Sequence, residues 1–242
     1  MRLNESTCLY NSRVVLRPYR RWHVPQYHVW MEDETIREQT ASERLTMQEE
    51  EDMQRSWRLD EDKLTFIVHL RSPSAPSPTS DPAGFLAAHN DASTMIGDAN
   101  LFLHAVTPPS SPTLPPVDSS STPTAPTPQP SHRAELEIMF PPSPLYAARS
   151  GLALSTLQLF LSYAARALSL PPTAFFARIG IDNAPSLGLF SKLGLSEVKR
   201  VEVFREVEMG WVADGDGDGW PWEKEEGWEQ GVLEDPRDEE RD

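Results

Sequence analysis

Residues Arg149 to Ala153, Arg-Ser-Gly-Leu-Ala, form a run of mostly small side chains directly before an apolar helical pattern. A turn of this kind leaves the first backbone N–H groups of the helix unpaired, with the positive end of the helix dipole behind them. Such groups bind anions, and a phosphate or pyrophosphate is a suitable ligand. An ordinary strand-to-helix connection would carry the same residues, because small-residue turns often precede helices. The spacing alone leaves both interpretations open.

Two regular elements flank this turn. Residues 134–140 read Ala-Glu-Leu-Glu-Ile-Met-Phe, and their alternation of apolar and charged side chains predicts a half-buried strand. After the turn, apolar residues recur at helical spacing and predict a helix with one face in the core: Leu157, Phe160, Leu161, Ala164 and Leu168. The sequence thus predicts a strand, a loop and a helix, with the candidate anion site at the start of the helix.

The remaining elements alternate along the chain. The helix predicted from residue 46 begins with a capping box formed by Thr46 and Glu49, and the helix at 183–192 begins at Asn183 and ends at Gly194. A further helix is predicted at 22–38. Strands are predicted at 13–19, 63–70, 95–106, 173–181 and 198–207. The predicted order is β, α, α, β, β, β, α, β, α, β.

Stretches of biased composition interrupt this order. Residues 72–94 begin with a proline- and serine-rich run, and residues 107–131 are mostly proline, serine and threonine. Such segments bury too little apolar surface to offset their ordering entropy, so we expect disordered insertions there. We therefore predict one domain at 1–208 that carries both insertions. Residues 209–242, which are strongly acidic and contain tryptophans, are expected to form a disordered tail.

The charge and the apolar pattern limit the partners and the location. The formal net charge is −15 and the lysines and arginines do not cluster, which argues against a nucleic-acid surface. No apolar run in the sequence approaches the ~20 residues that span a bilayer, and the N-terminus lacks the apolar region of a signal peptide. Cys8 is the only cysteine, which favours a reducing compartment. These features predict a soluble cytoplasmic protein, with the nucleus also open, that binds neither nucleic acid nor membrane.

No metal site is predicted. His23 and His28 are five residues apart and do not share a helix face, so we expect scattered surface histidines. Residues 214–225 match the spacing of an EF-hand calcium loop, but Pro221 occupies a position whose N–H normally pairs. Neither flank predicts a helix, and a motif without its context is weak evidence.

One segment carries a family resemblance. Residues 183–195, Asn-Ala-Pro-Ser-Leu-Gly-Leu-Phe-Ser-Lys-Leu-Gly-Leu, follow an apolar strand and resemble the pattern N-x-x-S-x-x-x-F-x-K-x-G-F of the GNAT acetyltransferase superfamily. The predicted element order is similar to that of the family. Shorter matches in the same order, among them residues 1–4, 40–43 and 97–103, resemble its N-acetyltransferase-9-like branch. The resemblance covers residues 1 to about 208 apart from the two insertions.

The resemblance implies an α/β (α+β) GNAT fold. A mixed, mostly antiparallel sheet would splay in the middle, between the strands at 135–140 and 174–181, with helices on both faces. Acetyl-CoA would lie in the gap as co-substrate, with its pantetheine arm along the first of these strands and its pyrophosphate at the turn before the helix. The residues implied to bind it are Ile138, Met139, Phe140, Arg149, Ser150, Gly151, Leu152, Ala153 and Asn183.

Three positions depart from the family pattern. Ala148 stands where glutamine or arginine is usual at the start of the pyrophosphate loop. Arg149 replaces a small residue, and its charge would act from a shifted position. Phe190 lies where many members have a tyrosine that can protonate the leaving thiolate. That acid is therefore missing from its usual place.

The implied activity is direct transfer of an acetyl group from acetyl-CoA to an amine of a protein or peptide. Glu135 and Glu137, which alternation places on one face of the cofactor strand, are the candidate catalytic bases for this amine. A solvated strand face would carry the same two residues, and proximity alone contributes much to direct transfer. The alternative is a degenerate GNAT domain without turnover, which would act as an interaction protein through the proline-rich insertion and the acidic tail.

Overall fold

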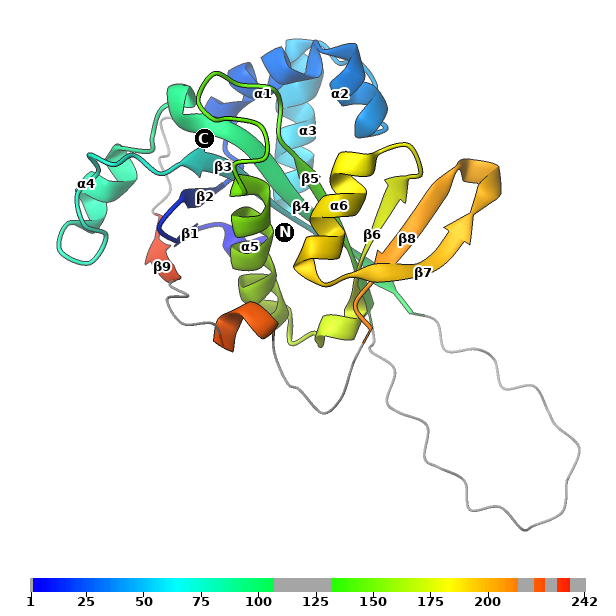
Figure 1. Cartoon of the computed structure of the whole chain (residues 1–242). Coiled ribbons are helices and arrows are strands. Elements are labelled where there is room, and N and C mark those ends of the chain that lie inside the picture. The colour runs from blue at the N-terminus through cyan, green and yellow to red at the C-terminus, as the bar shows by residue number, and fades with distance from the viewer. Residues whose placement is uncertain (1, 107–131, 213–219, 225–229, 236–242) are drawn as a thin grey trace, which may run out of the picture.

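The computed structural model describes residues 2–106, 132–212, 220–224 and 230–235 (Figure 1). The insertion predicted at 107–131 and most of the EF-hand-like run at 214–225 lie outside the described residues.

The described strands form one sheet in the order β7-β8-β6-β5-β4-β3-β2-β1-β9. Their bounds are β1 Thr7–Tyr10, β2 Val14–Pro18, β3 Lys63–Leu70, β4 Met95–Ala105, β5 His132–Met139, β6 Phe175–Gly180, β7 Ser196–Val201, β8 Glu206–Gly210 and β9 Gly231–Glu234. Neighbouring strands pair antiparallel except β5 and β6, which are parallel. The predicted mixed, mostly antiparallel sheet is confirmed.

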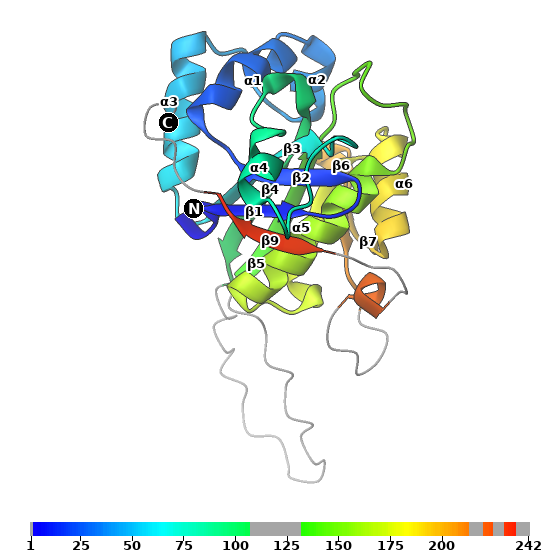
Figure 2. The ribbon, with the colours of Figure 1, turned by 90° about the vertical axis from the view of Figure 1, so that its left-hand side faces the viewer.

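Helices cover both faces of this sheet, as predicted (Figures 1 and 2). Helices α1 to α3 pack on one face and α5 and α6 on the other, where they share the largest apolar core. Their bounds are α1 Val24–Met31, α2 Glu34–Gln39, α3 Met47–Leu59, α4 Pro82–Ala87, α5 Leu152–Leu168 and α6 Ala184–Leu193. Among the described residues, no helix is both long enough and apolar enough to cross a membrane.

The predicted helix ends are confirmed where they depend on local signals. Thr46 and Glu49 form the capping box of α3, each side chain bonded to the other's backbone N–H. The Asn183 side chain accepts a hydrogen bond from the Ser186 N–H at 3.2 Å and caps α6. Gly194, with φ at +101°, ends that helix in the left-handed region that favours glycine.

Strands β5 and β6 diverge after two residue pairs. Ala134 pairs with Phe175 and Glu135 with Phe176, and the ladder ends there. Strand β5 continues to Met139 and β6 to Gly180. The facing backbone edges of the two strands beyond Glu135 are therefore not paired with each other, which confirms the predicted splay.

The prediction of a disordered insertion at 72–94 is wrong. This segment contains α4, whose start is capped by the Asp81 side chain, which accepts from the Gly84 N–H at 2.9 Å. Phe85 of α4 is fully buried, with its ring 5.2 Å from that of Tyr10 and 4.8 Å from that of His89. The proline- and serine-rich composition concealed a buried aromatic side chain that packs the segment against the sheet.

The prediction of a disordered tail at 209–242 is wrong for its described parts. Trp220 and Trp222 are buried and stack on each other with ring centroids 4.9 Å apart. The Trp222 Nε1–H donates to Ser162 Oγ of α5 at 3.0 Å. Strand β9 then pairs with β1 at the edge of the sheet. Apolar burial of the two indoles outweighs the acidic composition on which the prediction rested.

The expectation of scattered surface histidines is wrong for His23. This side chain is fully buried, and its Nε2 lies 3.3 Å from Nε2 of the equally buried His69 on β3. Burial is the largest cause that lowers the pKa of both imidazoles well below the usual range. The two rings therefore form a neutral pair inside the protein.

Candidate active site

The turn before α5 has the geometry of an anion site. Gly151 lies at the N-terminal end of the helix with φ at +81°, and no side chain caps it. The first main-chain bond of the helix runs from the Ser155 N–H to the Gly151 carbonyl, so the preceding N–H groups have no partner within the helix. Arg149 also has a positive φ, +60°, and its side chain is exposed. These residues fit a phosphate-bearing ligand at the helix N-terminus.

Arg13, in the turn between β1 and β2, brings a positive charge to the same place. Its Nη2 donates to the Ser150 carbonyl at 2.5 Å, and a Cβ added at Gly151 would lie 3.1 Å from its Nη1. The guanidinium thus stands beside the helix N-terminus, whereas the family pattern expects a polar or basic side chain at Ala148. Sequence reasoning missed Arg13 because 137 residues separate it from Ser150 and no local pattern links the two.

The end of β5 directs alternate backbone groups to opposite sides. The Met139 carbonyl faces β4, because a Cβ at Gly97 would collide with its oxygen. The backbone groups of Ile138 and Phe140 point the other way by strand alternation, toward the edge from which β6 has diverged. Two of the three predicted residues thus offer hydrogen bonds to an extended ligand, and Met139 has its backbone turned toward β4.

Asn183 caps the start of α6, and Phe190 lies within that helix. The Asn183 Oδ1 is engaged in capping, and among the described residues its Nδ2 has no hydrogen-bond partner, so the amide can still donate to a ligand. Phe190 is 3% exposed and belongs to the core. It offers no proton donor at the place where many family members have a tyrosine.

One carboxylate oxygen of Glu135 contacts basic side chains from both neighbouring strands. Its Oε2 lies 2.7 Å from Arg178 Nη1 on β6 and 2.8 Å from His104 Nε2 on β4. The side chain is also largely buried. A carboxylate oxygen held by a guanidinium and in contact with an imidazole has little freedom to accept a proton from a substrate.

Glu137 lies two residues further on the same face of β5, just beyond the last pair with β6. Among the described residues, its carboxylate has neither a hydrogen bond nor an ion pair. Partial desolvation by the surrounding protein raises its pKa to about 7, and the negative charges of Asp98 and Glu135 add to this effect, while Lys63 opposes it. The structure thus separates the two predicted bases: one is paired and one is available.

Asp98 on β4 is the buried carboxylate whose negative charge helps to raise the pKa of Glu137. It is 1% exposed and accepts hydrogen bonds from the Tyr27 hydroxyl at 3.1 Å and from Asn100 Nδ2 at 3.0 Å. Burial raises its pKa to about 6. Asn100 is the cross-strand partner of Glu137, and Asp98 lies two residues from Asn100 on β4. The carboxyl groups of Asp98 and Glu137 are therefore on the same face of the sheet.

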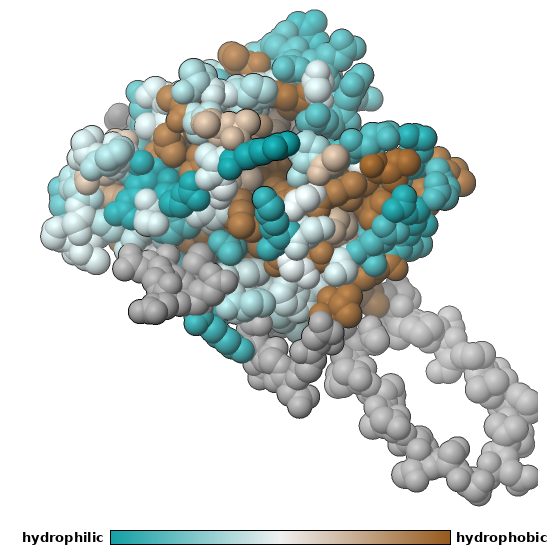
Figure 3. Space-filling model, in the orientation of Figure 1, coloured by the Kyte–Doolittle hydropathy of each residue, from teal (hydrophilic) through white to brown (hydrophobic). Residues whose placement is uncertain are grey.

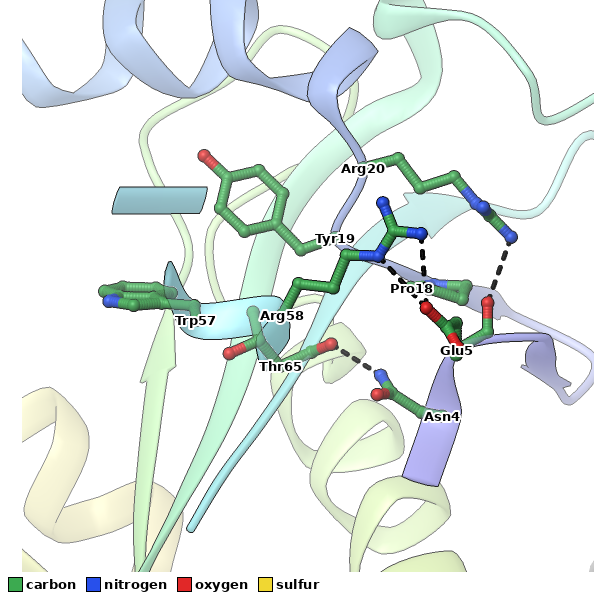
Figure 4. Close-up of a pocket in the computed structure, with 8 residues that line it drawn as sticks. All are labelled: Asn4, Glu5, Pro18, Tyr19, Arg20, Trp57, Arg58 and Thr65. Atoms are coloured by element: carbon green, nitrogen blue, oxygen red, sulfur yellow. Dashed lines mark hydrogen bonds and ion pairs between the residues drawn. The ribbon is translucent and has the colours of Figure 1, made fainter. Parts of the chain in front are cut away.

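A small pocket elsewhere on this face does not fit a cofactor. Its volume of about 20 Å³ has room for about one water molecule. Glu5 and Arg58 form an ion pair at 3.2 Å across it, and Asn4 Nδ2 donates to the Thr65 carbonyl. Figure 4 shows its lining residues, which are Asn4, Glu5, Pro18, Tyr19, Arg20, Trp57, Arg58 and Thr65.

Solved structures with the same arrangement of strands and helices define the class of protein. Over 82% of this chain and 94% of the other, the fold is similar to that of spermidine N-acetyltransferase from Vibrio cholerae in complex with CoA and spermine, with a TM-score of 0.54 and 17% identity. A GNAT-family acetyltransferase from Bacillus anthracis is similar over 84% of this chain and 96% of that chain, with a TM-score of 0.53 and 13% identity. The molecule therefore has the GNAT acetyltransferase fold.

Sequence comparison gives the family. The model of the acetyltransferase (GNAT) domain matches residues 13–196, and the chain belongs to this family, in its N-acetyltransferase-9-like branch. It is 40% identical to alpha/beta-tubulin-N-acetyltransferase 9 of Drosophila melanogaster, over 86% of this chain and 88% of that protein. It is 36% identical to an N-acetyltransferase 9-like protein of Nematostella vectensis, over 86% and 87%. The chain is thus an acyltransferase that takes an acetyl group from acetyl-CoA to an amine.

Proposed function

We propose that the chain transfers the acetyl group directly to an amine of a protein or peptide, with Glu137 as the general base. One observation carries this proposal. The Glu137 carboxylate has no hydrogen-bond or ion-pair partner among the described residues and is exposed where β5 and β6 diverge. Desolvation by the surrounding protein raises its pKa to about 7. A general base is most effective when its pKa lies close to the working pH.

The surrounding residues have complementary roles in this proposal. The N–H groups at Gly151 and the guanidinium of Arg13 hold phosphates, and the backbone of Ile138 and Phe140 holds the extended arm. Bound acetyl-CoA supplies an acetyl thioester that is already activated toward amines. Glu137 accepts the proton that the acceptor nitrogen loses as its bond to the acetyl carbon forms. The carbon–sulfur bond of the thioester breaks in the same transfer, and CoA leaves as a thiolate that takes up a proton from solvent. Fixed positions for both reactants supply the proximity on which direct transfer depends.

A macromolecular acceptor is supported by the surface beside the site and by the names of relatives. The bend between β7 and β8 exposes Val203 and Phe204, which are 88% and 72% accessible. Figure 3 shows brown, hydrophobic atoms at the surface over the β7–β8 end of the molecule. This bend adjoins the end of β6, where the Ile181 N–H donates to the Arg205 carbonyl. Adjacent exposed apolar side chains that form a patch mark interaction surfaces. Relatives from fly and mouse are named alpha/beta-tubulin N-acetyltransferases, so tubulin is the first acceptor to test, and it fits the expected cytoplasmic location.

The alternative is an interaction protein without turnover. Two tail tryptophans that would serve as binding residues, Trp220 and Trp222, are buried against the domain. This reduces what the tail offers a partner, and the insertion at 107–131 lies outside the described residues. We therefore prefer the enzyme.

The test is Glu137→Gln in the full chain, assayed with acetyl-CoA and purified tubulin. We expect kcat to fall by roughly 10²- to 10⁴-fold, because the base is removed. The rise in melting temperature with saturating acetyl-CoA should persist in this variant, since Glu137 is assigned no role in holding the cofactor. Glu197→Gln, on the exposed strand β7, is the matched control and should retain activity.

Two results would contradict the proposal. Full activity of Glu137→Gln would exclude this residue as the base. A wild-type protein that is neither stabilised by acetyl-CoA nor able to acetylate tubulin or peptides would favour the interaction protein. A protein that is stabilised but inactive on tubulin would point to another acceptor.

A further inference from the structure

The strand register places Arg178 on β6 opposite Glu137 on β5, but Arg178 forms its ion pair with Glu135. The parallel register pairs Glu135 with Phe176, so the next residues on the same face are Glu137 and Arg178. The strands diverge at this point, and the Arg178 guanidinium points back to Glu135, with Nη1 2.7 Å from its Oε2. Its Nε lies 3.9 Å from Oε2 of Glu208 on β8.

A network on this face keeps Arg178 in that position. Glu208 is held by Arg133 Nη2 at 2.9 Å, and Glu135 also lies 2.8 Å from His104 Nε2. The ring of Phe176 lies under two guanidinium groups, 3.9 Å from that of Arg133 and 5.1 Å from that of Arg178. Both carboxylates that bind Arg178 are largely buried, while Arg178 itself is about half exposed. The ion pairs therefore decide which way an otherwise mobile side chain points.

We propose that Glu135 is a positioning residue: it holds Arg178 away from Glu137, so that Glu137 stays unpaired and can accept the proton of the acceptor amine. This inference rests on the proposed role of Glu137. It changes the role of Glu135 from a candidate base to a group that acts through its neighbour.

The charges that face Glu137 explain why the direction of Arg178 matters. They come from Lys63 on β3, Asp98 on β4 and Glu135 on β5, with Arg178 on β6 as the additional cation within reach. The Lys63 ammonium is occupied above the ring of Trp57 at 3.7 Å. An arginine beside a carboxylate lowers its pKa by about 1–3 units. A base with a lower pKa accepts a proton less readily at neutral pH.

The test uses Glu135→Gln, Arg178→Gln and the double variant. In the full chain, the pH dependence of kcat/KM and the pKa of Glu137, from NMR of carboxyl-labelled glutamate, are measured. In Glu135→Gln, the released Arg178 should pair with Glu137, lower its pKa by one unit or more and reduce kcat/KM at least about tenfold. Arg178→Gln removes a cation and should move the pKa upward. The double variant should return to within about threefold of the wild-type rate.

The matched control is the Glu197–Arg200 pair on β7, joined at 2.7 Å and exposed. Glutamine at both positions should leave the pH profile unchanged. A double variant as slow as Glu135→Gln would overturn the inference, because the loss of activity would then come from the missing Glu135 carboxylate and not from the position of Arg178. An unshifted Glu137 pKa in Glu135→Gln would overturn it as well.

The NMR measurement separates this inference from the proposed function. If Glu137→Gln remains fully active while Glu135→Gln lowers the Glu137 pKa by one unit or more and the double variant restores most of that loss, the proposed base is wrong and the control of Arg178 by Glu135 is upheld. A pKa that stays equally low in the double variant reflects only the lost charge of Glu135 and overturns the inference. If Glu137→Gln is inactive and the pKa does not move in Glu135→Gln, the base is supported and the inference fails.

Discussion

Arg17 on β2 and Asp235, directly after β9, form a buried two-point ion pair across 218 residues of sequence. Arg17 Nε lies 2.8 Å from Asp235 Oδ2 and Arg17 Nη2 lies 2.7 Å from Oδ1. Arg20 Nη2 adds a bond to the Asp235 carbonyl at 2.9 Å. The returning C-terminal segment is thus joined to the sheet by charge as well as by the pairing of β9 with β1.

Asp235→Ala should destabilise the protein strongly. It leaves Arg17 buried without its carboxylate, and breaking a buried pair from one side costs about 3–5 kcal/mol. Urea unfolding, followed by tryptophan fluorescence, measures the change in free energy of unfolding. Glu234→Gln, at the exposed neighbouring position, should change it by less than about 0.5 kcal/mol. A loss below about 1 kcal/mol in Asp235→Ala would mean that the pair does not hold the segment.

Arg13→Gln should weaken acetyl-CoA binding by roughly tenfold or more, because a hydrogen bond to a charged group contributes about 1.5–3 kcal/mol. Isothermal titration calorimetry at two salt concentrations measures the effect. The wild-type affinity should also fall more steeply with salt than that of the variant. Arg55→Gln, in an exposed pair with Asp52 on α3, is the control with the same charge change. Equal affinities of Arg13→Gln and wild type would remove Arg13 from the anion site.

Phe85→Ala tests whether the segment at 72–94 is anchored. The ring is fully buried, and truncation of a buried phenylalanine costs about 3–5 kcal/mol. Hydrogen exchange should show faster exchange in α4 and its flanks, while α5 keeps its protection. Leu145→Ala, at an exposed apolar position, should have little effect on stability. Unchanged stability of Phe85→Ala would support the disordered insertion that the composition suggested.

The buried histidine pair predicts a loss of stability at acidic pH. The Arg20 N–H donates to His23 Nδ1 at 2.9 Å, so the His23 proton lies on Nε2 and is directed to His69. The His69 Nδ1–H can then donate to Thr94 Oγ1 at 2.8 Å. Each neutral ring uses its single N–H as a donor in this chain of hydrogen bonds. A further proton would charge one ring and leave it without an acceptor, which agrees with the lowered pKa of both rings.

The direction with pH follows from proton binding by the unfolded chain. Unfolded histidines bind protons as the pH falls through about 6.5, while the folded pair stays neutral, so stability falls over this range. Between pH 7.5 and 5.5 each histidine contributes a loss of about 1.4 kcal/mol. His69→Gln should show a correspondingly smaller loss than wild type in urea unfolding at the two pH values. Identical losses would contradict a neutral pair.

Local signals in the sequence were sufficient for much of the fold. The capping box of Thr46 and Glu49 and the ends of α6 at Asn183 and Gly194 depend on neighbours within a few residues, so their chemistry can be recognised in the sequence. The alternation of apolar and charged residues in the strand at 134–140 placed Glu135 and Glu137 on one face. It did not show which of the two is paired. What distinguishes their surroundings is Arg178, which comes from another strand and pairs with Glu135 alone of the two.

The parts that the sequence did not predict depend on distant contacts. Arg13 reaches Ser150 and β9 reaches β1 only after the chain has folded. Trp222 packs in the core that α5 shares, where Ser162 accepts its indole N–H. Composition averages over such single contacts, and this is why it described residues 72–94 and the described parts of the tail incorrectly.

The pairing of β1 with β9 also has a consequence for biosynthesis. Strand β1 leaves the ribosome early, and its outer partner follows more than two hundred residues later. At about 5–20 residues per second, that edge stays open for roughly 10–40 s of translation. Open strand edges recruit other strands. Slowly translated chains of this protein should therefore need ribosome-associated chaperones, which would keep the open edge of β1 from pairing with other strands until β9 is made.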